Sequence, residues 1–76
     1  MAKFLHLLKG DAGAIAVPVI RENSREPGVD VTVVLLHGAP DPSLPPGVRV
    51  RRLGEDGLDY AALLDLIFDS DHVVTW

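Results

Sequence analysis

Residues 29–36 constrain the fold most strongly, because they form the clearest strand in the sequence and indicate its surroundings. Apolar residues first alternate with Asp30 and Thr32, and residues 33–36 are then apolar without interruption. A short segment that is apolar on both sides is typical of a strand covered on both faces, as in a parallel sheet. Residues 4–8 form a second such run. The sequence therefore predicts two central strands of a mostly parallel sheet.

The segment between these strands predicts a crossover helix. Residues 12–26 mix small and branched apolar residues with a polar end, Asp11 is a suitable N-cap, and residues 27–28 (Pro-Gly) stop the helix. Pro18 lacks the amide hydrogen that an internal helical position requires. We therefore expect the helix to kink at Pro18 or to begin only near Val17.

The second half of the chain opens with a loop and a short strand. Residues 38–47 contain four prolines and form neither a regular helix nor a paired strand. Residues 48–53 then alternate, which places Val48 and Val50 on one face and Arg49 and Arg51 on the other. We expect the arginine face to meet water or an acidic partner.

A helix and a last strand follow. The helix is expected to begin at an Asp59 cap, and its apolar set falls at helical spacing: Tyr60, Leu63, Leu64, Ile67 and Phe68. Asp69 and Asp71 lie near its end, where the helix dipole disfavours negative charge. Either solvent exposure or pairing with the arginine face, of this chain or of a neighbour, accounts for them. Residues 72–76 predict a strand whose terminal Trp76 is anchored.

The order strand, helix, strand, loop, strand, helix, strand predicts the fold class. It favours a small three-layer α/β/α unit with a mostly parallel four-stranded sheet, formed as a single domain by residues 1–76. A ferredoxin-like antiparallel sheet is the alternative. The two strands that appear covered on both faces weigh against it, because that fold leaves one face open.

Composition limits the classes of function. Hydrophobic residues make up 47% of a chain of 76 residues, which predicts an oligomer because so small a domain has little interior. The net charge of −4 disfavours direct binding to nucleic acid. The apolar run near the N-terminus is too brief for a signal peptide or a membrane span, so we expect a cytoplasmic protein that does not bind membranes. The absence of cysteine excludes disulfides and thiol nucleophiles.

The carboxyl ends of the two central strands are the expected place for a ligand, as in other open α/β sheets. Candidate ligand-binding residues there are Lys9, Gly10, Asp11, Gly13, His37 and Gly38. Backbone donors at the start of a helix, helped by a lysine, suit a small anion or a nucleotide. The segment nevertheless lacks the dinucleotide and P-loop patterns, and an ordinary strand-to-helix turn also explains it.

Other reactive side chains form no recognisable constellation. His6, His37 and His72 have no metal-ligand spacing, and neither the serines nor the carboxylates have catalytic neighbours in the sequence. We therefore predict no catalytic residue, no metal site and no cofactor. Arg49, Arg51 and Trp76 are candidates for a partner interface, although arginines on an exposed strand also serve solubility and edge protection.

Short motifs along the chain resemble the DsrH/TusB-like family of the DsrE/DsrF/DsrH sulfur-relay superfamily. They are residues 3–8 (KFLHLL), 31–38 (VTVVLLHG), 47–56 (GVRVRRLGED), 59–67 (DYAALLDLI) and 72–76 (HVVTW). The resemblance implies a flavodoxin-related α/β fold. The sheet would be trimmed, because the helix and strand that the family usually places after the acidic stretch are missing here.

The resemblance also implies a function. Related subunits carry a cysteine as the sulfur carrier, in the same polypeptide or in a partner, and this chain has none. It would therefore be a non-catalytic subunit like the TusB/DsrH component of a sulfur relay, assembled with cysteine-bearing DsrE-like subunits, in tRNA wobble-uridine thiolation or sulfur oxidation. A small anion- or nucleotide-binding protein and a homo-oligomer without the ancestral role are the alternatives.

Overall fold

The protein is an α/β unit built on one parallel sheet. The computed structural model describes residues 2–10, 13–36, 44–54 and 58–76. Along the chain lie β1 (Ala2–Leu8), α1 (Gly13–Arg25), β2 (Val29–Leu35), β3 (Arg49–Arg52), α2 (Tyr60–Asp69) and β4 (His72–Thr75). The strand order is β3-β2-β1-β4, and every neighbouring pair is parallel. The predicted strands are confirmed, with ends that differ by one or two residues.

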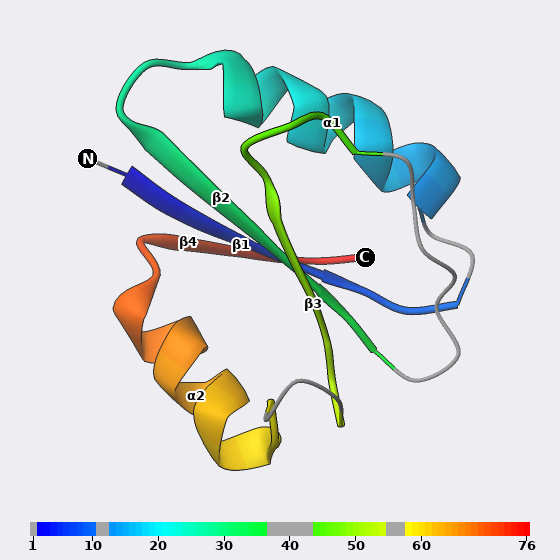
Figure 1. Ribbon diagram of the computed structural model, residues 1–76, viewed down its shortest axis with the longest axis vertical. Helices are drawn as coiled ribbons and strands as arrows, with labels where there is room; N and C mark the ends of the chain where they lie inside the picture. The colour runs from blue at the N-terminus through cyan, green and yellow to red at the C-terminus, as the bar shows by residue number, and fades with distance from the viewer. Residues whose placement is uncertain (1, 11–12, 37–43, 55–57) are drawn as a thin grey trace.

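The sheet is the middle one of three layers. Helix α1 covers one face and α2 covers the opposite face (Figure 1). This arrangement confirms the predicted three-layer unit with its four-stranded sheet, and the sheet is parallel throughout. The antiparallel ferredoxin-like alternative is wrong, because every pair of neighbouring strands among the described residues is parallel.

Each face of the sheet has its own hydrophobic core. The core between α1 and the sheet contains Leu8, Ala16, Ile20, Val31, Val33 and Leu35. The core between α2 and the sheet contains Leu5, Val34, Leu53, Leu58 and Leu63. Adjacent residues Val33 and Val34 of β2 are both fully buried, although they point to opposite faces. Burial of one such aliphatic side chain contributes about 1.5–3 kcal/mol. The continuous apolar run in the sequence therefore reflects two covered faces.

Helix α1 contains its proline. The helix begins at Gly13, so the expected late start near Val17 is wrong, and Pro18 lies inside it. Ala16 and Ile20 flank the proline and are completely buried against the sheet. Packing of this side of the helix thus compensates for the missing backbone hydrogen bond.

Helix α2 begins where the sequence predicts. The Asp59 side chain accepts a hydrogen bond from the backbone N–H of Ala62 at 2.8 Å, which satisfies one of the free donors at the helix start. The predicted apolar set is divided by the packing, however. Leu63 is buried and Ile67 is partly buried against the core, whereas Tyr60, Leu64 and Phe68 are exposed. The sequence spacing indicated one apolar face, and the sheet covers only part of it.

Candidate functional site

The ligand site predicted at the carboxyl ends of the strands lies only partly within the described structure. Lys9 and Gly10 follow β1 directly and are exposed, and Gly13 is the first residue of α1. Gly10 has a φ of 57°, a conformation that glycine adopts readily, so the chain turns immediately after the strand. The remaining candidates, Asp11, His37 and Gly38, lie outside the described residues. The anion site therefore stays a prediction.

The alternation predicted for β3 is present. Arg49 and Arg51 align with Thr32 and Val34 of β2 and so share the face that α2 covers, whereas Val50 points to the α1 side. The arginine face therefore lies beside α2 within the same chain. Arg49 is exposed, while Arg51 is partly covered.

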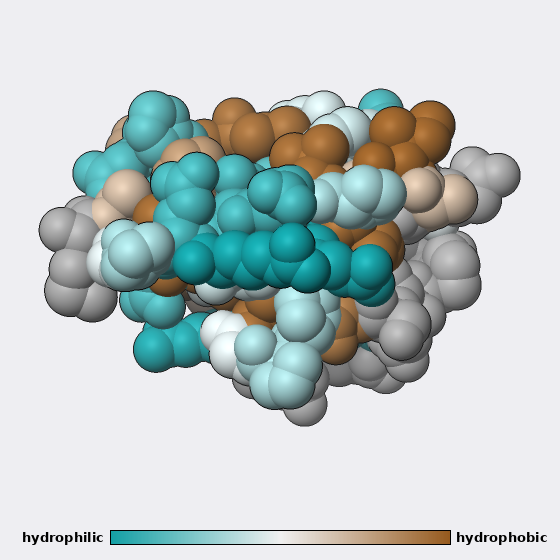
Figure 2. Space-filling view, turned by 90° about the horizontal axis from the view of Figure 1, so that it is seen from above, coloured by the Kyte–Doolittle hydropathy of each residue, from teal (hydrophilic) through white to brown (hydrophobic). Residues whose placement is uncertain are grey.

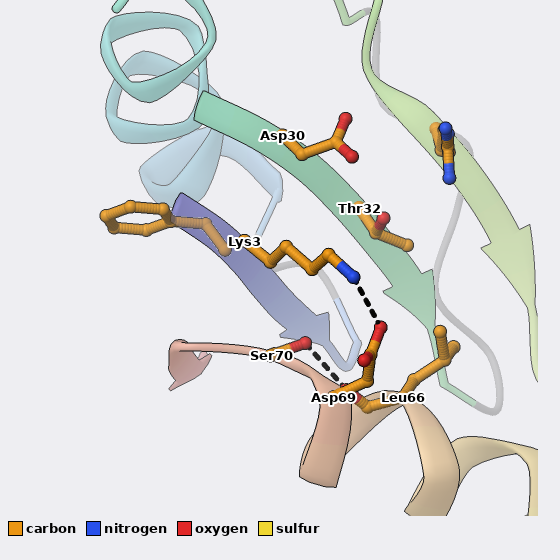
Figure 3. Close-up of a pocket in the computed structure, with 8 residues that line it drawn as sticks. Lys3, Asp30, Thr32, Leu66, Asp69 and Ser70 are labelled. Atoms are coloured by element: carbon orange, nitrogen blue, oxygen red, sulfur yellow. Dashed lines mark hydrogen bonds and ion pairs between the residues drawn. The ribbon is translucent and has the colours of Figure 1, made fainter. Parts of the chain in front are cut away.

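A small pocket opens at the amino ends of the strands, on the α2 side of the sheet. Its volume is about 80 Å³, and it is lined by Lys3, Phe4, Asp30, Thr32, Arg49, Leu66, Asp69 and Ser70. Figure 3 shows Lys3 reaching from β1 to Asp69 at the end of α2, with Asp30 and Thr32 beside it on β2. Because a water molecule occupies about 30 Å³ in the liquid, the space suits a few waters or a very small ligand. Ligands of open α/β sheets normally bind at the opposite end.

Two acidic residues at the end of α2 and directly after it, Asp69 and Asp71, converge on Lys3. Lys3 Nζ donates to Asp69 Oδ2 at 2.8 Å, and the backbone N–H of Lys3 donates to Asp71 Oδ2 at 2.8 Å. The hydrogen bond from Lys3 to Asp69, followed by the attraction of that carboxylate, raises the pKa of Lys3 above its usual value. Asp69 and Asp71 are both exposed, as the first of the two readings expects. The pairing that they make is with Lys3 on β1 and not with the arginine face of the second reading.

The lysine of this pocket is thus committed to a structural ion pair. The pairing joins the end of α2 to the first strand of the sheet, and the exposed positions of both side chains make it weak in water. Among the described residues, no group of three histidines or carboxylates converges on a possible metal position. The polar contacts of this pocket therefore attach α2 to the sheet and do not form a reaction site.

A buried polar network lies on the other face of the sheet. His6 of β1 is completely buried, its Nε2 lies 3.0 Å from Asn23 Oδ1 on α1, and Trp76 Nε1 donates to its Nδ1 at 3.1 Å. Since the indole N–H only donates and Asn23 presents its oxygen, the ring is neutral with the proton on Nε2. Burial lowers the pKa of His6, while its hydrogen bond to Asn23 acts in the opposite direction.

This network anchors Trp76, as predicted. The His6 and Trp76 rings are stacked with centroids 6.1 Å apart. Sequence reasoning missed the partners, because it placed His6 in a strand and Trp76 after another without knowing that β1 and β4 are neighbours. A lone histidine within an apolar strand was the available signal, since a buried polar group needs a partner.

Helix α2 carries an exposed apolar stripe, which we define as Tyr60, Leu64 and Phe68. These residues are 66%, 53% and 84% exposed, and their spacing of four places them on one side of the helix. Three large apolar side chains aligned on a surface helix are typical of a protein-binding surface. Sequence reasoning identified these residues as apolar but did not separate them from the core set.

The outer side of α1 differs from this stripe. It exposes Ile15 and Val19, but Arg21, Glu22 and Arg25 are exposed on the same helix. Figure 2, which views the molecule from the α1 side, shows a hydrophilic band with hydrophobic side chains emerging beside it. Mixed surfaces of this kind are normal for monomeric proteins. The stripe on α2 is therefore the stronger candidate for a functional surface.

Within the described residues, no helix combines the length and the apolar character that a membrane span requires. Comparison with known proteins finds no family model, no curated protein and no solved structure that matches this chain.

Proposed function

We propose that this protein is a non-catalytic subunit of a cytoplasmic protein assembly, resembling the TusB/DsrH component of a sulfur relay. In this role the chain supplies a binding surface and partner subunits supply the reactive groups. The absence of cysteine is consistent with the proposal, because a sulfur relay passes a persulfide between cysteine thiols and this chain has no thiol to accept it.

The exposed apolar stripe on α2 is the observation that carries the proposal. Phe68 is 84% exposed although it is among the largest apolar residues of the chain. Leaving such a side chain in water forgoes about 1.5–3 kcal/mol of burial energy. A partner subunit that covers the stripe recovers that energy.

The resemblance supplies the chemistry of the assembly. Related subunits act together with cysteine-bearing DsrE-like proteins, in tRNA wobble-uridine thiolation or in sulfur oxidation. We therefore assign the sulfur-carrying thiol to a DsrE-like partner, which this chain would bind and position.

A binding experiment with a defined partner tests the proposal. The purified chain is mixed with the cysteine-bearing DsrE-like subunit from the same cell, and the complex is measured by size-exclusion chromatography and calorimetry. We expect a stable complex that Phe68→Glu on the stripe weakens strongly. Ile15→Glu is the matched control, because Ile15 is exposed to a similar degree on the opposite layer.

Two results would contradict the proposal. One is the absence of any complex with the DsrE-like subunit at high micromolar concentration. The other is turnover of a thiol or persulfide substrate by the purified chain alone, since a binding subunit without a reactive group has no such activity.

A further inference from the structure

The two edges of the sheet are protected very differently. Strand β3 forms one edge, and three of its four residues are arginines. Strand β4 forms the other edge, and its sequence His-Val-Val-Thr contains no lysine, arginine, aspartate or glutamate. Charged side chains on an edge strand prevent pairing with other strands. The β3 edge is therefore guarded, and the β4 edge is open to pairing.

The stripe on α2 lies on the same side of the molecule as the open edge. Leu66 and Asp69 line the pocket together with residues of β2 and β3, so that side of α2 points towards the β3 edge. With 100° between successive residues, Leu64 lies on the opposite side of the helix, towards β4. Val73 of β4 aligns with Leu5, shares the α2 face of the sheet and is 40% exposed. The stripe and Val73 together form what we term the edge patch.

We infer that the edge patch and strand β4 bind a second copy of this chain across a two-fold axis. Strand β4 pairs antiparallel with β4 of the second copy, which joins two four-stranded sheets into one of eight strands. Both α2 helices then lie on the same face of the continuous sheet, and their stripes pack against each other. The inference rests on the proposed function as a subunit. A second copy covers the same stripe that the DsrE-like subunit would bind, so the two partners compete for it.

A second copy fits this surface because the surface is complementary to itself. The uncharged β4 strand has no like charges to repel its own copy. The two-fold axis repeats every contact, so each favourable contact between the two copies occurs twice.

The area of the edge patch is also appropriate. A stable interface of standard size buries about 800 Å² on each partner. Fully covered aromatic side chains bury about 150–250 Å² each, so Tyr60 and Phe68, with Leu64 and Val73, provide about half of that area. The paired β4 strands and the residues around them provide the remainder.

The test measures mass in solution and uses the two exposed valines of the sheet edges. Wild-type chain is expected to sediment at twice its monomer mass of 8.2 kDa at micromolar concentration. Val73→Lys places two positive charges near the two-fold axis and should raise the dissociation constant of the dimer roughly tenfold or more. Val50→Lys, at a valine of similar exposure on the guarded edge, should leave the dimer unchanged.

Hydrogen exchange adds a readout that does not depend on a variant. Backbone amides on the outer side of β4 should become protected as the protein concentration increases, whereas amides of β3 should not change. A monomer mass at every concentration up to the millimolar range would overturn the inference. A dimer that Val73→Lys leaves intact, with circular dichroism showing a folded variant, would overturn it as well.

These outcomes are separable from those that test the proposed function. A monomer that still binds the DsrE-like subunit through the stripe contradicts the two-fold interface and leaves the proposed function standing. A dimer that Val73→Lys disrupts but that binds no DsrE-like subunit supports the interface and contradicts the sulfur-relay role.

Discussion

The side chain of Trp76 donates a hydrogen bond from Nε1 to Nδ1 of His6 at 3.1 Å, and this contact joins residues 70 positions apart in the chain. The imidazole is buried on the face of the sheet that α1 covers, and its other nitrogen faces Asn23. The arrangement requires a neutral imidazole, because a proton on Nδ1 would leave the indole N–H facing another donor. The charge state of one buried histidine therefore controls the attachment of Trp76.

Mild acid should destabilise the fold through His6. Burial lowers the pKa of His6 in the folded chain below the value of about 6.5 that histidine has when unfolded. As the pH falls below about 6.5, the unfolded chain binds more protons than the folded one, so the stability that is complete above this pH decreases. Urea unfolding at a series of pH values above the titration of the carboxylates measures the effect.

The elements that pack against His6 offer few other titrating groups. On its face of the sheet β2 presents valines, α1 presents Asn23, and β4 presents the exposed His72. His72→Asn is therefore the control and should retain the pH dependence. If His6→Gln keeps the same dependence between pH values of about 6.5 and 5, the assignment to His6 fails.

Removal of the indole donor should cost stability. Trp76→Phe keeps an aromatic ring against His6 but leaves Nδ1 without its hydrogen bond, which should lower the free energy of unfolding by about 1–3 kcal/mol. Chemical denaturation at neutral pH measures the change. A variant as stable as the wild type would show that this hydrogen bond is not needed to hold the ring.

The cap of α2 should contribute a defined amount. Asp59→Ala removes the acceptor for the backbone N–H of Ala62, with an expected loss of about 1 kcal/mol. Asp65→Ala, at an exposed position inside the same helix, removes the same charge without removing a cap and should change stability by less than about 0.5 kcal/mol. Equal losses in the two variants would argue against the capping role.

Two adjacent leucines should differ strongly in their effect on folding. Leu63→Ala leaves a cavity in the core beneath α2 and should cost about 2–5 kcal/mol, because Leu63 is buried. Leu64→Ala should change the stability of the monomer by less than about 0.5 kcal/mol. The two variants are compared by thermal unfolding at a protein concentration below that of any self-association. A large loss in Leu64→Ala under these conditions would contradict the exposed position of the stripe.

The layered fold was predictable because the composition of each strand indicates whether one or both of its faces are covered. Residues 29–36 and 4–8 are apolar on both sides, and the structure covers both faces of β1 and β2. The strand order was not available, because parallel neighbours are joined by long crossovers and no turn motif records which strands pair. For the same reason the sequence did not show that Asp69 and Asp71 pair with Lys3, because these residues come together only where β4 lies beside β1.

The outcome for α1 and α2 shows where packing overrides local signals. Pro18 predicts an interruption, yet burial of the residues around it maintains the helix. The spacing of Tyr60, Leu64 and Phe68 predicts an apolar face but not whether this chain covers that face. Periodicity records the apolar character of a side chain, and only the three-dimensional arrangement decides whether it contacts the core or the solvent.

The position of β4 has a consequence for the order in which the sheet forms. Lys3 and Asp71, which lie directly before the β1–β4 pair, are separated by 68 positions. The strands in the described part of the chain pair only in parallel, so none of them forms a hairpin that could arise early from local contacts. Bringing such distant segments together costs a large loss of chain entropy before any stabilising contact between them forms. Because its pairing with β1 depends on these distant contacts, we expect β4 to join a core already built by β1, β2 and α1.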